Sequence, residues 1–192
     1  THSRRFGYEQ NGLHDDWYHA YCAMLKNLKK DARAVKVEIP EIDMLLLYAK
    51  LSKNILKKVQ ASLVDFDLWA PNLFVDPQFL KGTGEGGLIW IDPERMFWGD
   101  PVAEFVAMDY DVRILADKPM LKYYNRFAEK KITGDHEEQI RFYFAEALLA
   151  VIMDVEKYYR YTEGDEGYTR NTATVKDLYQ NSLNGLKEML EK

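Results

Sequence analysis

Four carboxylates and one amide stand close together in two short stretches of the sequence. The first stretch, Leu63-Val-Asp-Phe-Asp-Leu-Trp-Ala-Pro-Asn72, contains Asp65, Asp67 and Asn72. The second stretch, Ile91-Asp-Pro-Glu94, contains Asp92 and Glu94. Both have the pattern of strand ends and loops, and a carboxylate buried there would need an ionic partner or a metal. This placement indicates chemistry rather than packing.

Asn72 and Asp92 are the pair best placed to bind one hard cation. The apolar runs 72–75 and 88–91 flank a glycine-rich segment, 81–87, which predicts two strands joined as a β-hairpin. A hairpin would bring the two ends, and with them Asn72 and Asp92, side by side. Mg²⁺ prefers a sparse set of carboxylate and amide oxygens completed by water and phosphate. Asp67 then remains as a separate carboxylate that could orient or deprotonate a hydroxyl nucleophile.

The elements that must position these residues are mostly helical. Periodic apolar residues predict a helix from Trp17, capped by Asp15 or Asp16, and a second from Pro40 to Lys58. Ser62–Val64 is a further short strand, and Asp100 before Pro101 is a helix cap. Three more helices are expected at 120–131, 136–160 and 172–191, with a polar, exposed loop at 161–170. The fold class is therefore α+β and mostly helical, in one domain over residues 1–192.

Composition and charge exclude several classes of protein. A formal net charge of −5 argues against nucleic acid as a partner, because such binding relies on basic patches. Cys22 is the only cysteine, which excludes an internal disulfide and a cysteine metal cluster. No apolar run is long enough to predict a membrane span, and no signal segment opens the chain. We therefore expect a soluble, cytoplasmic protein.

The two acidic stretches and the segment after them resemble one family of enzymes. The matching run is Asp65-Phe-Asp67, then Leu68-Trp-Ala-Pro71, Asn72, Ile91-Asp92 and Trp98-Gly-Asp-Pro101. This is similar to the aminoglycoside phosphotransferase superfamily, the kinase-like small-molecule phosphotransferases. Its pattern is His-x-Asp, four residues and Asn, then a metal-binding Asp after a strand, and commonly Gly-Asp-Pro. Phe6-Gly-Tyr8 and the helix from Trp17 extend the resemblance to nearly the whole chain.

The resemblance implies a protein-kinase-like C-terminal lobe with a small β-hairpin that carries the catalytic and metal-binding loops. It implies transfer of the γ-phosphate of ATP or GTP to a hydroxyl of a small molecule. Asp67 would be the catalytic base, and the cofactor Mg²⁺ would be held by Asn72 and Asp92, with Glu94 assisting a second metal. Phe74 and Ile91 would lie under the adenine ring, and the role of Asp100 would be structural support.

Two departures from the family pattern leave alternatives open. Asp65 stands where the family has His, so it would brace the loop through backbone amides, and its charge would raise the pKa of Asp67. No glycine-rich strand-turn-strand and no strand-borne lysine precedes Asp15, so we expect the catalytic lobe only, inactive by itself. One alternative is a catalytically silent kinase-like domain with a binding role. Another is a Mg²⁺-dependent hydrolase that uses Asp65 and Asp67.

Overall fold

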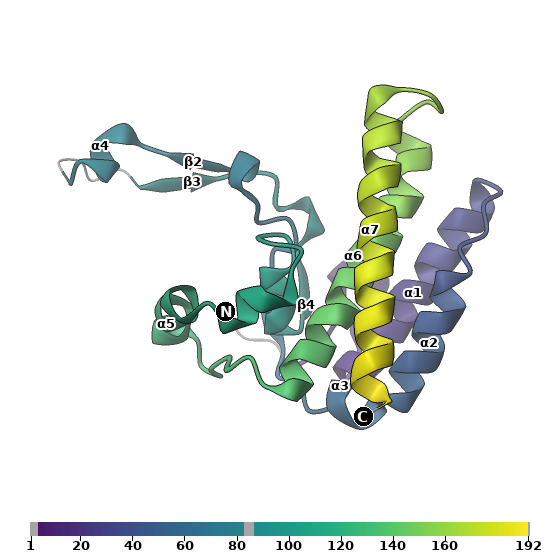
Figure 1. The fold of residues 1–192 in the computed structure, drawn as a ribbon, viewed down its shortest axis with the longest axis horizontal. Helices are drawn as coiled ribbons and strands as arrows, with labels where there is room; N and C mark the ends of the chain where they lie inside the picture. Colours follow the sequence, from purple (N-terminus) through teal and green to yellow (C-terminus); the bar gives the residue numbers. More distant parts are fainter. Residues whose placement is uncertain (1–3, 83–86, 192) are drawn as a thin grey trace.

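The fold is α+β and mostly helical, as expected, and it carries two small two-stranded sheets. A computed structural model describes residues 4–82 and 87–191. Helices α1, α2, α6 and α7 stand side by side on one side of the molecule, and the β2–β3 hairpin projects from the other, with α5 beneath it (Figure 1). The α-helices are α1 (Trp17–Ala34), α2 (Glu41–Leu51), α3 (Lys53–Leu56), α4 (Pro77–Leu80), α5 (Lys118–Phe127), α6 (His136–Arg160) and α7 (Glu166–Leu190).

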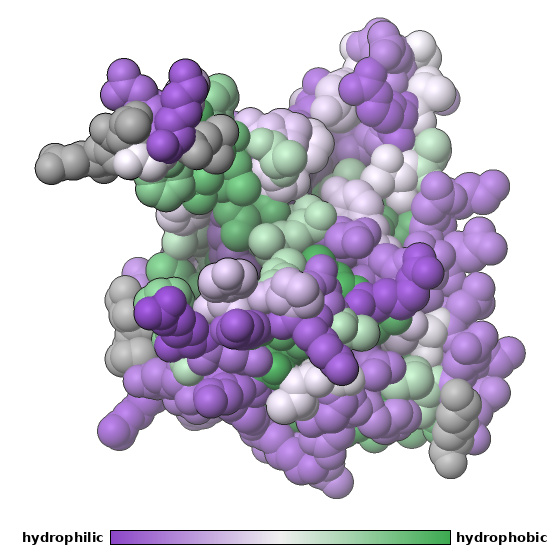
Figure 2. Space-filling view, turned by 60° about the vertical axis from the view of Figure 1, so that its left-hand side comes forward, coloured by the Kyte–Doolittle hydropathy of each residue, from purple (hydrophilic) through white to green (hydrophobic). Residues whose placement is uncertain are grey.

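The strands and the single-turn helices connect these two sides. The strands are β1 (Ser62–Val64), β2 (Leu73–Val75), β3 (Leu88–Trp90) and β4 (Phe97–Gly99), and the 3-10 helices are η1 (Glu9–Asn11), η2 (Ala70–Asn72), η3 (Pro93–Arg95), η4 (Pro101–Phe105) and η5 (Val112–Ala116). Among residues 4–82 and 87–191, no helix combines the length and the apolar character needed to cross a membrane. Figure 2 shows hydrophobic side chains gathered beneath the hairpin, whereas much of the surrounding surface is hydrophilic.

Helix boundaries follow from capping side chains, and three of them differ from the sequence prediction. Asp16 caps α1 as expected, because its side chain accepts from the backbone N–H of His19 at 2.9 Å. The prediction of one helix to Lys58 is wrong, since α2 ends at Ser52 and a separate turn, α3, follows. The helix predicted at 120–131 lies at 118–127, where Asp117 caps it. The loop predicted at 161–170 is shorter, because α7 already begins at Glu166.

The hydrophobic core gathers around α6 and the aromatic residues of α1 and β4. The α6 face predicted to be apolar is buried, and the hydroxyl of Tyr21 donates to the backbone carbonyl of Phe144 at 3.0 Å. The ring of Trp17 stacks on Phe97 with centroids 5.6 Å apart. Phe97 is both buried and part of β4. These contacts fix β4, and through it β1, against the helices.

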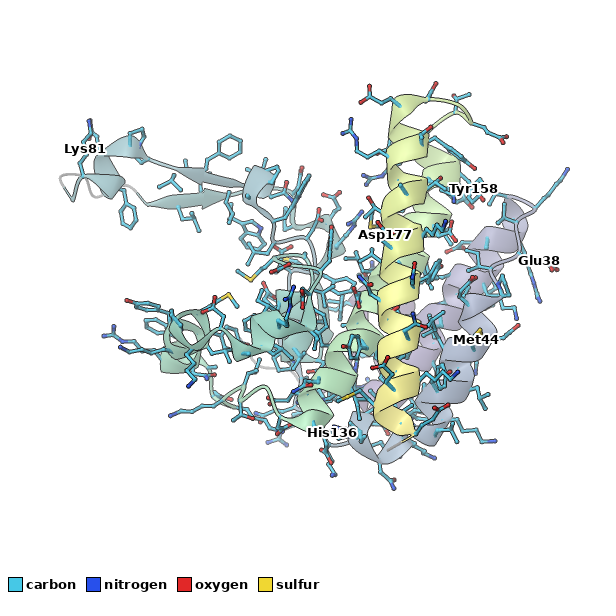
Figure 3. All side chains as sticks on the ribbon, in the orientation of Figure 1. Glu38, Met44, Lys81, His136, Tyr158 and Asp177 are labelled. Carbon is cyan, nitrogen blue, oxygen red and sulfur yellow. The ribbon has the colours of Figure 1, made fainter. Side chains whose placement is uncertain are left out.

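Both sheets are antiparallel, and together they hold the two acidic stretches. β1 pairs with β4 so that Ser62 lies opposite Gly99. The predicted hairpin is confirmed, because β2 pairs with β3. Its tip carries α4 and Lys81, which is labelled in Figure 3. Most of the glycine-rich segment predicted as the turn, residues 83–86, lies outside the described residues.

Replacement of Gly99 by alanine is expected to destabilise the fold by about 1–3 kcal/mol, because the added methyl group overpacks the core. A Cβ atom at Gly99 would lie 2.2 Å from the ring of Phe97 and 3.2 Å from the ring of Trp17, and both rings are buried. Urea unfolding measures the change. Gly87→Ala is the matched control, since a Cβ there meets nothing within 4 Å among the described residues. Equal midpoints for the two variants would contradict this packing.

Candidate active site

The two sheets bring the acidic stretches together at one end of the hairpin. β1 ends at Val64, and the loop 65–69 leads into η2, which ends at Asn72. The backbone N–H of Ile91 donates to the carbonyl oxygen of Asn72 at 3.1 Å, which extends the β2–β3 pairing by one step. Asp92 therefore follows directly after the residue that pairs with Asn72. The structure thus places Asn72 and Asp92 on neighbouring segments.

Backbone strain is concentrated at the same place. Among the described residues, three other than glycine have a positive φ, and two of them are Phe66 (63°) and Asp92 (58°). A non-glycine residue in this left-handed region costs on the order of 1–3 kcal/mol, and such residues cluster at functional sites. Phe66 is fully buried, so the strained residue between Asp65 and Asp67 anchors this loop in the core. The strain therefore orients the loop that carries Asp67.

Asp67 is held from both sides by hydrogen-bond donors. The side-chain amide of Asn72 donates to the backbone carbonyl of Asp67 at 3.0 Å and to its Oδ2 at 3.2 Å. The guanidinium of Arg95 donates to Oδ1 at 3.1 Å. Burial raises the pKa of Asp67 above its ordinary value, Arg95 and Asn72 lower it, and the charges of Glu94 and Glu156 raise it further. The net result is a carboxylate of fixed orientation with a raised pKa.

Arg95 and Glu156 were not identified from the sequence, although they complete the surroundings of Asp67. Arg95 bonds Glu156 of α6 at 2.7 Å, and Arg160 bridges Glu156 at 3.8 Å and Glu94 at 3.4 Å. Acidic and basic groups therefore alternate from Asp67 to Glu94, which ties the loop 65–69 to the C-terminal end of α6. The sequence offered only a weak signal for either residue. Arg95 is a basic residue directly after Asp-Pro-Glu, and Glu156 is one of several acidic residues on a helix with an apolar face.

The predicted metal ligands offer hard oxygens but no complete cage. No group of three or more His, Cys, Asp or Glu in the described part of the chain is arranged to hold a metal ion. Because Asn72 donates through its amide nitrogen, its amide oxygen is the atom left for a cation. Asp92 and Glu94 are exposed. This donor set fits Mg²⁺, which keeps several waters and takes few protein ligands.

The hairpin presents Phe74 and Ile91 on one face, as a nucleotide floor would require. Phe74 lies opposite Ile89, and alternation along the strand puts Ile91 on the same side. Phe74 is 54% exposed and Ile91 is 38% exposed. The opposite face carries Leu73, whose partner is Trp90. The described residues leave the Phe74 face open to solvent.

Asp65 does not brace the loop in the way the sequence suggested. It is 4% exposed, and no donor among the described residues reaches either carboxylate oxygen with the geometry of a normal hydrogen bond. The backbone N–H of Asp67 and the indole of Trp90 lie near enough to lower its pKa, but burial, the largest effect, raises that pKa overall. The brace is Glu104 instead, which accepts from the backbone N–H of Asp65 at 2.9 Å. A carboxylate this buried is a poor nucleophile for the hydrolase alternative.

The expected influence of Asp65 on Asp67 is also corrected. The like charges that raise the pKa of Asp67 come from Glu94 and Glu156, after burial. The charge of Asp67 instead raises the pKa of Asp65. The negative charge of Asp65 is therefore not among the causes that raise the pKa of Asp67.

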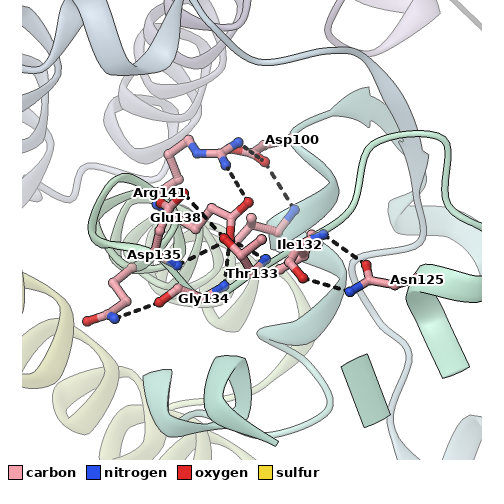
Figure 4. Close-up of polar contacts among 10 residues, drawn as sticks. Asp100, Asn125, Ile132, Thr133, Gly134, Asp135, Glu138 and Arg141 are labelled. Carbon is pink, nitrogen blue, oxygen red and sulfur yellow. Dashed lines mark hydrogen bonds and ion pairs between the residues drawn. The ribbon is translucent and has the colours of Figure 1, made fainter. Parts of the chain in front are cut away.

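Asp100 has the structural role that was predicted. Its carboxylate accepts from the backbone N–H of Val102 at 3.0 Å, which caps η4. It also accepts from Arg141 of α6 at 2.9 Å, and Arg141 lies 3.4 Å from Glu138 (Figure 4). The buried ion pair of Asp100 and Arg141 therefore joins the segment after β4 to α6, at the centre of the core.

A polar cavity of about 310 Å³ lies beside the site, between η5, α6 and α7. Glu146, Asp111 and Tyr143 line it together with three amide side chains, Gln180, Asn181 and Asn184. Tyr110 also lines it, and the pKa of Tyr110 is raised by burial and then by the charge of Asp67. Tyr110 therefore links this cavity to the surroundings of Asp67, and the polar lining suits a hydroxylated small molecule.

Stability is expected to fall as the pH rises from about 5 to about 8, by on the order of 1–3 kcal/mol. Burial, followed by the charge of Asp111, raises the pKa of Glu146 from 4.5 to about 8. The folded state keeps this proton over a range where the unfolded chain has lost it, so folding binds a proton. The stabilisation is complete at pH values below the pKa of Glu146 in the unfolded chain. It is lost as the pH approaches the pKa of Glu146 in the folded chain.

Urea unfolding across this pH range measures the slope. Glu146→Gln should flatten it, because glutamine has no proton to lose. Glu188→Gln, a change at an exposed position on the rim of the same cavity, should leave it unchanged. An identical slope for Glu146→Gln and the parent chain would show that Glu146 has the same pKa in the folded and the unfolded chain.

Comparisons with protein-family models, curated proteins and solved structures found no match to this chain.

Proposed function

We propose that this chain is the catalytic lobe of a kinase-like phosphotransferase, which moves the γ-phosphate of ATP or GTP to a hydroxyl of a small molecule in the cytoplasm. One observation carries the proposal. Asn72 donates to the carboxylate of Asp67 at 3.2 Å and its carbonyl oxygen accepts from Ile91 at 3.1 Å, directly before Asp92. Hydrogen bonds thus join the candidate base Asp67 to the candidate metal ligand Asn72, and join Asn72 to the residue before Asp92, the second candidate ligand.

In this mechanism the protein aligns groups rather than forming covalent bonds, as is general for phosphoryl transfer. Asp67 Oδ1 and Oδ2 are fixed by Arg95 and Asn72, so the carboxylate can accept a hydrogen bond from the acceptor hydroxyl. The acceptor oxygen bonds to the γ-phosphorus as the bond to the β-phosphate oxygen breaks, and Asp67 takes the hydroxyl proton. Bound Mg²⁺ would neutralise phosphate charge, with Asn72, Asp92 and Glu94 as its candidate ligands.

The acceptor would enter from the polar cavity beside Tyr110. The cavity volume of about 310 Å³ lies at the lower end of the range for small-molecule sites. Its carboxylates and amides can donate to or accept from several hydroxyl groups at once. The nucleotide would lie on the opposite side of Asp67, against Phe74 and Ile91.

A catalytically silent binding domain is the second candidate. Two observations favour it: both carboxylate oxygens of Asp67 already contact donors, and Asp65 is buried without hydrogen-bond partners among the described residues. In a silent domain, the ion pair of Asp67 with Arg95 would be purely structural. The full-length gene product, assayed with Mg²⁺, ATP or GTP and a panel of hydroxylated small molecules, decides between the two. Neither turnover nor nucleotide binding would favour the silent domain.

The 192-residue chain alone is expected to bind nucleotide with a Kd no tighter than about 1 mM. No described element covers Phe74 and Ile91, so an adenine ring would be stacked on one side only. Isothermal titration with MgATP measures the affinity, and the full-length gene product is the comparison. A micromolar complex with the isolated chain would contradict this exposed floor.

A further inference from the structure

A second cavity, larger and mainly apolar, lies beneath the hairpin. Its volume is about 620 Å³, well within the range of small-molecule sites. The lower face of the hairpin lines it with Leu73 and Trp90, and α5 lines it from below with Met120 and Tyr124. Hydrophobic side chains gather in this region of the surface (Figure 2). Asp67, Asn72 and Asp92 are not among its lining residues.

Two carboxylates lie in the wall of this apolar cavity. Asp65 is 4% exposed and both of its oxygens lack a hydrogen-bond partner within the described part of the chain. Glu104 lines the same cavity and accepts from the backbone N–H of Asp65 at 2.9 Å. Burial raises the pKa of Glu104 to about 7, and the charge of Asp65 adds to that rise. Two acids thus share one poorly hydrated place, and neither is the proposed base or a candidate metal ligand.

Positive charge to balance these acids is absent from the cavity. None of its described lining residues is Lys, Arg or His. A buried carboxylate without a partner is costly, and a cation in hydrogen-bonding contact offsets that cost. The rings of Trp90 and Tyr124 also line the cavity, and aromatic faces attract cations. An anion would be repelled, and a neutral hydrocarbon would leave both carboxylates without a cationic partner.

We propose that this cavity binds a small organic cation, namely a protonated primary amine on an apolar body, with the ammonium group at Asp65 and Glu104. The apolar body fills the space between the hairpin and α5, and burial of its surface supplies affinity at about 25 cal/mol per Å². The site is separate from the polar cavity beside Tyr110. Occupancy therefore does not depend on phosphoryl transfer, and the two proposals can fail independently.

Titration calorimetry of the chain with 2-phenylethylammonium chloride tests the site, at a pH above the Glu104 pKa of about 7. The neutral analogue 2-phenylethanol has the same apolar body without the charge. The ammonium is expected to bind at least about tenfold more tightly than the alcohol. Asp65→Asn and Glu104→Gln should each weaken ammonium binding by about tenfold, because each removes one charge-assisted hydrogen bond.

The alcohol also reports whether each variant still forms the cavity. Its affinity should stay unchanged in Asp65→Asn and Glu104→Gln, so that a lost ammonium site is distinguished from a lost fold. Asp109→Asn is the matched control, since Asp109 is exposed and does not line the cavity. Equal binding of ammonium and alcohol, ammonium affinity indifferent to both substitutions, or no detectable ammonium binding would each overturn the proposal. Asp67→Asn should leave ammonium binding unchanged.

Discussion

Replacement of Asp67 by asparagine is expected to lower kcat of the full-length gene product by about 10²–10⁴-fold, the usual contribution of a positioned acid or base. Asparagine keeps the shape of the side chain and one oxygen for Arg95, which now bonds Oδ1 at 3.1 Å. It cannot take the proton of the acceptor hydroxyl. The loss should therefore fall on kcat, while KM for the nucleotide changes little. Steady-state kinetics with a coupled ATPase readout and product detection measures both constants.

A control must show that loss of one negative charge is not the cause. Asp177→Asn serves this purpose, because Asp177 is exposed on α7 and is labelled there in Figure 3. Its kcat should match that of the parent protein. Turnover that survives Asp67→Asn would remove Asp67 from the mechanism and would leave Asn72 and Asp92 as a metal or phosphate site without a base.

The pH dependence of kcat is a second test of the role of Asp67. A general base acts in its ionised form, so the rate should fall as the pH drops through the pKa of Asp67. Burial places that pKa above the ordinary value for aspartate. Arg95→Met should raise the pKa further, because the favourable charge of Arg95 is lost. The acid limb of the profile would then move to higher pH.

The parts of the fold that the sequence predicted are those set by neighbouring residues. The β2–β3 hairpin follows from two apolar runs around a glycine-rich segment, and the caps Asp16 and Asp100 act within three residues of their own positions. Local hydrogen bonding of this kind is encoded in spacing. The break at Ser52 was missed because the residues around it, Ser52-Lys-Asn54, include neither glycine nor proline to signal the end of a helix.

The parts that were missed depend on partners far away in the sequence. β4 is only three residues long and exists because β1, more than thirty residues earlier, pairs with it. Arg95 and Glu156 are 61 residues apart, and only the packing of α6 brings them together. Asp65 shows the same limit. It was expected to brace the loop, but Glu104 does so by accepting from the backbone N–H of Asp65. This contact depends on the position of η4, and Glu104 lies 39 residues later in the sequence. Spacing within one motif cannot encode such pairs.

The second large effect is expected at the buried ion pair of Asp100 and Arg141. Arg141→Met should destabilise the protein by about 3–5 kcal/mol, the usual result of removing one partner of a buried pair. Asp100 is 1% exposed, so its carboxylate would stay buried with only the Val102 N–H as a donor. Arg141 also lies beside Glu138, whose carboxylate accepts from the backbone N–H groups of Thr133 and Gly134 at 2.7 Å (Figure 4).

An exposed ion pair that involves Glu137 of α6 provides the comparison for this change. Lys58 and Glu137 are 2.6 Å apart with both side chains largely in solvent, so Lys58→Met should cost less than about 1 kcal/mol despite the shorter distance. Urea unfolding of both variants shows whether burial or the distance between the two charges decides how much an ion pair contributes to stability. A double variant, Asp100→Leu with Arg141→Met, should recover part of the lost stability, because the Asp100 carboxylate is no longer buried without its cationic partner. The Glu138 carboxylate keeps its backbone N–H donors in both variants.

Loss of the ion pair between Asp100 and Arg141 should also change the activity of the candidate site. Asp100 caps η4, and Glu104 of η4 holds the backbone N–H of Asp65 at the start of the catalytic loop. If the ion pair positions this loop, Arg141→Met should lower kcat even at temperatures where the protein is fully folded, and the more stable double variant should not restore it. Full activity in the double variant would show that Asp100 contributes stability alone and that Glu104 positions the loop without it.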